Sequence, residues 1–254
     1  MSKKGMRFLP AVLIGLFLFA GCAVNRTNGV EKEKAKALEN MGTSLVLQGQ
    51  YRAALEPFLK ALEIDPENPE IHNNLALVYQ ELGEYDLSLK HFQRALHLDP
   101  KFLEAMNNMG VLYVQLGEWD LALHCFKKAA EDIRYKTPQF AYHNIGSVYF
   151  HKGQFQKAIE YYQRAIRLAP TYMDAYRSLA SAYEALDRME EAIQTYHQIF
   201  DIDPQSWDAH LNLGKLYLRL NRRQDAVKEL ELVIQSDPRS PISEEAKKLL
   251  DKVR

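Results

Sequence analysis

Residues 145–170 read IGSVYFHKGQFQKAIEYYQRAIRLAP, and this stretch decides the fold. Its small residues, Gly146 and Ala158, let two helices approach each other closely. Gly153 tolerates the backbone conformation of a tight turn between those helices. Pro170 cannot continue the second helix, so the chain must turn again there. The stretch therefore predicts a unit of two helices joined by a turn.

The unit recurs with a period that the prolines mark. Pro66 and Pro100 are 34 residues apart, as are Pro170 and Pro204, and Pro204 and Pro238. Pro100 and Pro170 are 70 residues apart, which is two periods plus two residues. Each period has a turn residue that tolerates a left-handed conformation. These turn residues are Gly49, Gly83, Gly117, Gly153, Asp187 and Asn221.

Two more positions recur in the same register, a small residue in the first helix and a large one in the second. The small residue allows close approach, and the large one fills the gap between units. The small residues are Gly42, Ala76, Gly110, Gly146, Ala180 and Gly214. The large residues are Phe58, Phe92, Phe126, Tyr162, Tyr196 and Leu230.

This pattern resembles the tetratricopeptide repeat (TPR), with its Leu-Gly-x-x-Tyr, Ala-x-x-x-Phe and Pro positions. The resemblance implies an all-α fold, a right-handed superhelix or α-solenoid of six helix–turn–helix repeats within residues 33–240. After Pro238, apolar residues at a spacing of three to four predict a capping helix over residues 241–254. The repeats are placed at 35–68, 69–102, 103–138, 139–172, 173–206 and 207–240. The apolar residues of the capping helix are Ile242, Ala246, Leu249, Leu250 and Val253.

The N-terminus has the pattern of a secretory signal peptide over residues 1–21. Three basic residues precede an apolar run, residues 8–20, that is short for a membrane span. Small residues directly before Cys22 resemble the bacterial lipobox, which implies acylation of the Cys22 thiol and of the new N-terminus. Several acyl chains anchor a protein stably. Ala23 after the cysteine favours the periplasmic face of the outer membrane. The polar residues 22–32 are expected to form a tether.

Composition and motifs favour a binding protein over an enzyme. The net charge is -1 and no basic stripe with interleaved aromatics occurs, so we expect no nucleic-acid partner. No phosphate-binding loop, dinucleotide fingerprint or nucleophile elbow occurs, so we expect no catalysis, cofactor or small-molecule substrate. His143 and His151 would lie about 12 Å apart on one helix, too far to share a metal ion. Cys125 is expected to act as a small hydrophobe.

The first helices of the repeats are the expected docking surface, because they line the concave side of a TPR superhelix. In the family the second, fifth, ninth, twelfth and thirteenth repeat positions face inward. An apolar strip flanked by side-chain amides there would suit an extended or helical peptide, and the alternative is that these residues pack within the solenoid. A lysine that clamps a carboxylate in some TPR domains is absent from the fifth position. The candidate partner-binding residues are Asn73, Leu77, Gln80, Asn107, Val111, Val114, Gln115, Phe140, His143 and Phe150.

The lipobox, the length, the six repeats and the irregular junction at residues 129–138 together resemble the type IV pilus biogenesis lipoproteins. That family acts as a pilotin, which escorts the outer-membrane secretin and promotes its assembly. The resemblance implies a protein partner, either a peptide or an unassembled secretin subunit, and a membrane contact through the lipid. Alternatives are a periplasmic adaptor that docks proteases or peptidoglycan hydrolases, a generic TPR interaction lipoprotein, and an enzyme subunit or glycan-binding protein.

Overall fold

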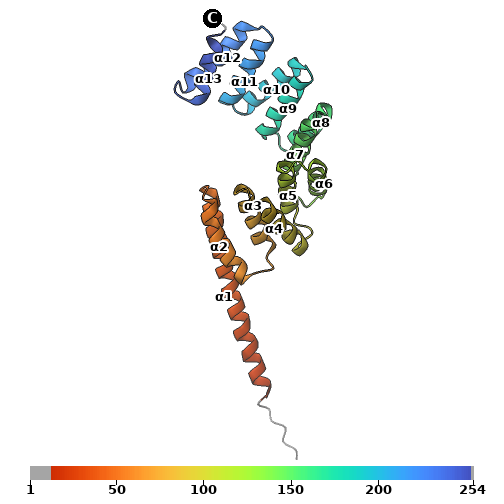
Figure 1. Ribbon diagram of the computed structural model, residues 1–254, viewed down its shortest axis with the longest axis vertical. Coiled ribbons are helices and arrows are strands. Elements are labelled where there is room, and N and C mark those ends of the chain that lie inside the picture. The colour runs from red at the N-terminus through yellow and green to blue at the C-terminus, as the bar shows by residue number, and fades with distance from the viewer. Residues whose placement is uncertain (1–12, 253–254) are drawn as a thin grey trace, which may run out of the picture. The chain divides into compact units, whose positions relative to one another are not determined.

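The computed structural model describes residues 13–252, with side chains from residue 29 onward (Figure 1). The described chain contains thirteen α-helices and no strand, which confirms the all-α fold class. The predicted signal peptide and the Cys22 side chain lie outside the described side chains, so the lipid anchor stays a prediction. Within the described residues, no helix is both long and apolar enough to span a bilayer.

The chain divides into two compact units, residues 1–105 and residues 106–254. In the first unit, each helix packs on the next one along the chain. Its helices are α1 (Leu13–Leu47), α2 (Tyr51–Ile64), α3 (Pro69–Glu81) and α4 (Tyr85–Leu98), and α5 (Leu103–Gln115) crosses the boundary.

The second unit continues the same succession of packed helix pairs, from α6 to α13. Its helix bounds are α6 (Trp119–Ala130), α7 (Pro138–His151), α8 (Phe155–Leu168), α9 (Met173–Ala185), α10 (Met189–Ile202), α11 (Trp207–Arg219), α12 (Arg223–Ser236) and α13 (Pro241–Leu250).

The turn inside each repeat has the left-handed backbone that its sequence predicts. All six predicted turn residues have positive φ, including the non-glycine residues Asp187 at 59° and Asn221 at 57°. The next backbone N–H then reaches back to the helix, as when Gln154 donates to the Tyr149 carbonyl at 2.8 Å. This bond satisfies a carbonyl that the end of the helix leaves unpaired.

Helix pairs in the repeats touch at the small residues that the repeat pattern singled out. A Cβ atom added at Gly146 would lie 2.6 Å from the ring of Tyr162, and one at Gly110 would lie 2.6 Å from that of Phe126. Such distances are well inside van der Waals contact, so each large residue of the second helix sits directly against the first helix. The predicted close approach is confirmed in these repeats.

The segment expected to be a tether, residues 22–32, is helical and belongs to α1. It contains no proline and continues into residues 33–39, which are rich in Glu, Lys and Ala, all strong helix formers. Its role as a tether beside a lipid anchor remains a prediction.

The last helix, α13, covers the end of the repeat array as expected of a capping helix. Its Ala246 and Leu250 join a buried cluster with Leu211, Leu230 and Val233 from the last repeat. The cap is fixed at its start by Ser240, whose hydroxyl accepts a hydrogen bond from the Ser243 N–H. Val253 lies outside the described residues.

Candidate functional site

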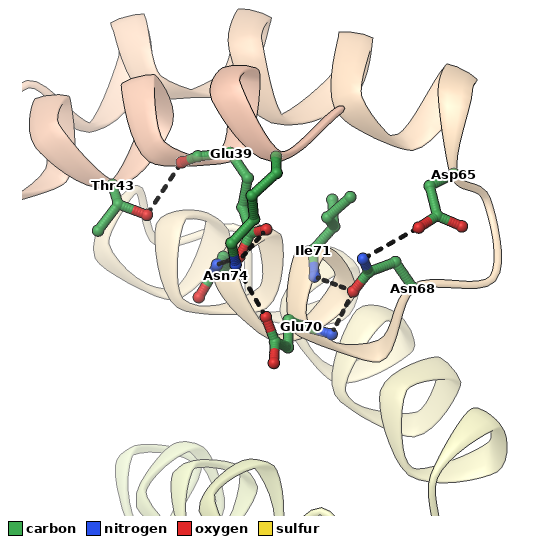
Figure 2. Close-up of polar contacts among 8 residues, drawn as sticks. Glu39, Thr43, Asp65, Asn68, Glu70, Ile71 and Asn74 are labelled. Carbon is green, nitrogen blue, oxygen red and sulfur yellow. Dashed lines mark hydrogen bonds and ion pairs between the residues drawn. The ribbon is translucent and has the colours of Figure 1, made fainter. Parts of the chain in front are cut away.

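A row of side-chain hydrogen bonds joins the first helices of successive repeats, and we call it the ladder. In the first unit, the Asn74 amide on α3 donates to the Glu39 carboxylate on α1 at 3.2 Å (Figure 2). Glu39 occupies the fifth position of its repeat, and Asn74 the sixth position of the next. The Glu39 carboxylate is only 4% exposed and also accepts from Lys36 at 2.9 Å. The hydrogen bond to Glu39 raises the pKa of Lys36.

In the second unit, hydrogen bonds between the same positions form a ladder of their own. The Asn144 amide donates to the Asn107 carbonyl oxygen at 3.2 Å, and the His143 Nε2 lies 2.9 Å from the Ser178 hydroxyl. Each bond again links a fifth position to the sixth position of the following repeat. Two predicted partner-binding residues, Asn107 and His143, therefore already have partners within the chain.

The ladder was not predicted from the sequence, although a recurring residue type marks its position there. Asparagine recurs at the sixth position of five repeats, with serine in the remaining one. An amide at this position can donate to the neighbouring first helix while its own helix keeps its regular backbone bonds. The sixth-position residues are Asn40, Asn74, Asn108, Asn144, Ser178 and Asn212.

A pocket of about 270 Å³ opens beside the ladder in the second unit, and we call it the α7–α9 pocket. Phe150, His151 and Tyr162 supply its aromatic walls, and Arg177 and three serines line the remainder. The small serine side chains leave the space that larger residues would fill. The lining residues are Ser147, Phe150, His151, Tyr162, Arg177, Ser178 and Ser181.

Packing against neighbouring residues holds the aromatic walls of this pocket in place. The Phe150 ring packs edge-on against Phe155, with ring centroids 5.1 Å apart, and it adjoins the main core of the second unit. Tyr162 is 2% exposed, and burial raises the pKa of its hydroxyl, so the hydroxyl stays protonated at neutral pH. The aromatic walls at Phe150 and Tyr162 are thus preformed.

The charged wall of the pocket is Arg177, whose guanidinium is already paired. It donates to the carboxylates of Asp174, at 2.8 Å, and of Asp208. An arginine that is neutralised by two carboxylates is a poor anchor for a free carboxylate. The pocket therefore suits an apolar side chain better than an acidic one.

The other predicted partner-binding residues, apart from Phe150, do not line this pocket. Phe140 is 40% exposed and its ring packs edge-on against Tyr172, with centroids 5.2 Å apart. On α5, Val111 and Val114 are half-buried and Gln115 is exposed. On α3, Asn73 and Gln80 are buried and Leu77 is half-buried. The buried Gln80 Oε1 has no hydrogen-bond partner among the described residues.

Groups that could support catalysis or metal binding are dispersed. In the described part of the chain, no three His, Cys, Asp or Glu side chains gather where they could hold a metal ion. His151 stacks on Trp119 with ring centroids 5.4 Å apart, and His143 belongs to the ladder. Cys125 is 2% exposed, as predicted, and burial raises the pKa of its thiol to about 11. Such a thiol is inert at neutral pH.

Models of known repeat families match almost the whole helical array. A TPR repeat model matches residues 42–83, and tetratricopeptide repeat models match residues 69–102, 101–171, 137–205 and 188–253.

Solved structures of TPR proteins have the same fold over most of the chain. PilF of Pseudomonas aeruginosa is 23% identical with a TM-score of 0.71, over 86% of this chain and 98% of that one. PilW, described as a widely conserved type IV pilus biogenesis factor, is 24% identical with a TM-score of 0.75, over 84% and 98%. YrrB, described as a TPR protein with an unusual peptide-binding site, is 26% identical with a TM-score of 0.54, over 75% and 97%. This chain belongs to the tetratricopeptide repeat proteins.

Proposed function

We propose that this chain is a scaffold that holds a segment of a protein partner against the α7–α9 pocket. The observation that carries the proposal is the pocket itself, an aromatic hollow of about 270 Å³ that α7, α8 and α9 line in repeats 4 and 5. Pockets that bind ligands are concave and mostly apolar, with a few polar groups that fix orientation. An apolar side chain of the partner would enter between Phe150 and Tyr162.

The polar rim supports a peptide as the ligand. Ser147 and Ser181 donate to carbonyls of their own helices, at 3.1 Å in each case. The Ser147 oxygen also accepts from the Tyr162 hydroxyl at 3.4 Å, so each serine oxygen keeps at least one lone pair to accept with, and Ser181 keeps two. A backbone N–H that flanks the inserted side chain could use these acceptors. YrrB, whose described feature is a peptide-binding site, has a similar fold.

The proposed partner is an unassembled secretin subunit of a type IV pilus, and the proposed location is the periplasmic face of the outer membrane, through lipid on Cys22. The similarity to PilF and PilW supports the pilus role, together with the lipobox and Ala23 in the sequence. A subunit that has not yet joined its ring exposes apolar segments, which an apolar pocket could cover.

Filling the pocket tests the proposal without removing its walls. Ser181 is exposed at the rim, so Ser181→Trp should occupy the hollow while the core stays intact. We expect the full-length chain in detergent to bind purified, unassembled secretin subunits at least about tenfold more weakly after this change. Thr43→Trp is the matched control, because Thr43 has the same repeat position, is exposed and lies outside the pocket.

Two outcomes would count against parts of the proposal. Equal binding by both tryptophan variants would exclude the pocket as the docking site. If a photocrosslinker placed at position 181 in living cells captured a peptidoglycan hydrolase or a protease and no secretin, the adaptor function would replace the pilus role. In that case the pocket would remain the binding site.

A further inference from the structure

The turn between α6 and α7 holds an isoleucine fully in solvent. Ile133 is 99% exposed, the largest exposure among the large hydrophobic residues described. The turn around it is well ordered by hydrogen bonds, because the Asp132 carboxylate accepts from the Arg134 N–H at 3.0 Å and the Asp132 carbonyl from the Tyr135 N–H at 3.0 Å. Tyr135, on the other side of the turn, is only 5% exposed and anchors it. The chain thus presents an apolar side chain from a fixed position.

A cavity of about 350 Å³ lies directly beside this isoleucine. Its walls include Tyr135, Pro138 and Tyr142, with the half-exposed Leu168 at its edge. The Tyr142 hydroxyl donates to the Ala130 carbonyl at 3.2 Å, which turns its polar end away and leaves the ring as a wall. An apolar projection and an apolar cavity therefore share one surface, which we call the junction surface.

Three charged residues line the cavity, and one of them, Asp132, is paired with Arg134. The other two, Glu131 and Arg164, form no ion pair among the described residues. Arg164 instead lies over the ring of Tyr142, with its guanidinium carbon 4.1 Å from the ring centroid. The junction surface thus carries an acid and a base that are both available to a partner.

We propose that the junction surface is the interface of a homodimer, with a second copy of this chain as its occupant. A two-fold interface uses the same patch on both subunits, so it must be complementary to itself. The junction surface meets that requirement twice, since it pairs a projection with a cavity and an acid with a base. Ile133 of each copy enters the cavity of the other, and Glu131 of each copy meets Arg164 of the other.

The patch is small, so the dimer is weak and forms in a concentration-dependent way. The proposal does not depend on the partner held in the α7–α9 pocket, because the two sites share no lining residue.

Sedimentation velocity on the full-length chain, in detergent with micelles in excess over protein, tests the proposal. The wild-type chain should associate to a dimer at micromolar concentrations, and Ile133→Glu should weaken the association at least about tenfold. Since Ile133 is in solvent, the variant should melt at the wild-type temperature. Leu186→Glu is the matched control, because it changes an exposed leucine outside the cavity and should dimerise normally.

Charge reversal makes the test specific for a self-complementary interface. Glu131→Arg alone and Arg164→Glu alone each place like charges opposite one another and should weaken the dimer, whereas the double reversal should restore it. A wild-type chain that stays monomeric throughout would overturn the proposal. So would a dimer that is unaffected by Ile133→Glu, or a double reversal that restores nothing.

Discussion

Repeats 2 and 6 carry a histidine at the same position of their first helices, and the pKa values of the two rings are shifted in opposite directions. In both repeats the ring reaches back to the proline before the repeat, His72 to the Pro66 carbonyl at 3.2 Å and His210 to the Pro204 carbonyl at 3.1 Å. In both, the other ring nitrogen meets a side chain that lies 19 residues further along. That side chain is His91 in repeat 2 and Glu229 in repeat 6.

In repeat 6 the partner is a carboxylate, which favours the cationic ring. In the cationic ring, Nδ1–H donates to Glu229 at 2.6 Å and Nε2–H donates to the Pro204 carbonyl, so both protons have an acceptor. Burial lowers the pKa of His210, but the bonds to Glu229 and Pro204 outweigh it, and the net shift is upward. The Phe200 ring stacks on the imidazole with centroids 4.1 Å apart, which also favours a cation.

In repeat 2 the partner is a second histidine, which favours neutral rings. Since His72 donates its Nε2 proton to the carbonyl, its Nδ1 accepts from His91, whose Nδ1 lies 2.9 Å away. Burial lowers the pKa of His91 to about 4, with further contributions from His72 and Lys90. Burial also lowers the pKa of His72. One residue on the second helix thus decides the sign of the pH response at an otherwise equivalent position.

The largest expected effect comes from removing the acid of repeat 6. Glu229→Ala should cost about 2–3 kcal/mol of local stability at pH 6, because a buried histidine loses its charged partner. Hydrogen exchange of α11 and α12 would measure the loss. Glu160→Ala, on an exposed helix face, is the control and should change little. A cost no larger than that of the control would show that the ion pair is unimportant.

The next largest effect is expected from acidification, which should change the stability of repeats 2 and 6 in opposite directions. His91 has a folded-state pKa below its ordinary value of 6.5, so its stabilisation is present above pH 6.5 and is lost as pH falls toward 4. His210 has a raised pKa, so its stabilisation is present below pH 6.5 and is lost as pH rises through the folded-state pKa.

With allowance for solvent screening of a half-exposed ring, repeat 2 should lose about 1–2 kcal/mol between pH 7 and pH 4.5. NMR signals of the histidine rings, followed as a function of pH, would measure the pKa values of His91 and His210. Histidines that titrate together near pH 6.5 would contradict the comparison.

A smaller effect should follow from giving repeat 2 the acid of repeat 6. In His91→Glu, the Nδ1–H of His72 gains a carboxylate partner, so the pKa of His72 should rise above 6.5. The acid sensitivity of α3 and α4 should then disappear, a gain of about 1 kcal/mol near pH 5 relative to wild type. His97→Glu, at an exposed position on the same helix, serves as the control. Persistent acid sensitivity in His91→Glu would mean that another group is responsible.

The smallest effect is expected from His72→Tyr. In repeat 5 the same position is Tyr176, whose hydroxyl donates to the Pro170 carbonyl at 3.1 Å. A tyrosine in repeat 2 should reach the Pro66 carbonyl in the same way, so stability at pH 7 should change by less than about 1 kcal/mol. Chemical denaturation at pH 7 would measure the change. A loss of several kcal/mol would show that a hydrogen bond to the Pro66 carbonyl is not enough to keep the stability at position 72.

The repeat architecture could be predicted from sequence because neighbouring residues encode it. A turn such as that at Asn221 depends on what one residue tolerates, and a contact such as that of Gly146 with Tyr162 recurs at a constant separation. Evidence from six copies adds up, so substitution of Asp or Asn for glycine in two turns did not obscure the pattern. The capping helix α13 was recognisable for the same reason, from the spacing of its apolar residues alone.

What the side chains do on that scaffold was decided by the tertiary structure. The sequence proposed Asn107 and His143 as peptide ligands, yet in the fold each is bonded to a residue of the following repeat. The α7–α9 pocket exists because serines from two helices meet around Phe150. Side chains 19 or 35 residues apart become neighbours only once helices stack, and their burial and charge then depend on partners that no local pattern specifies.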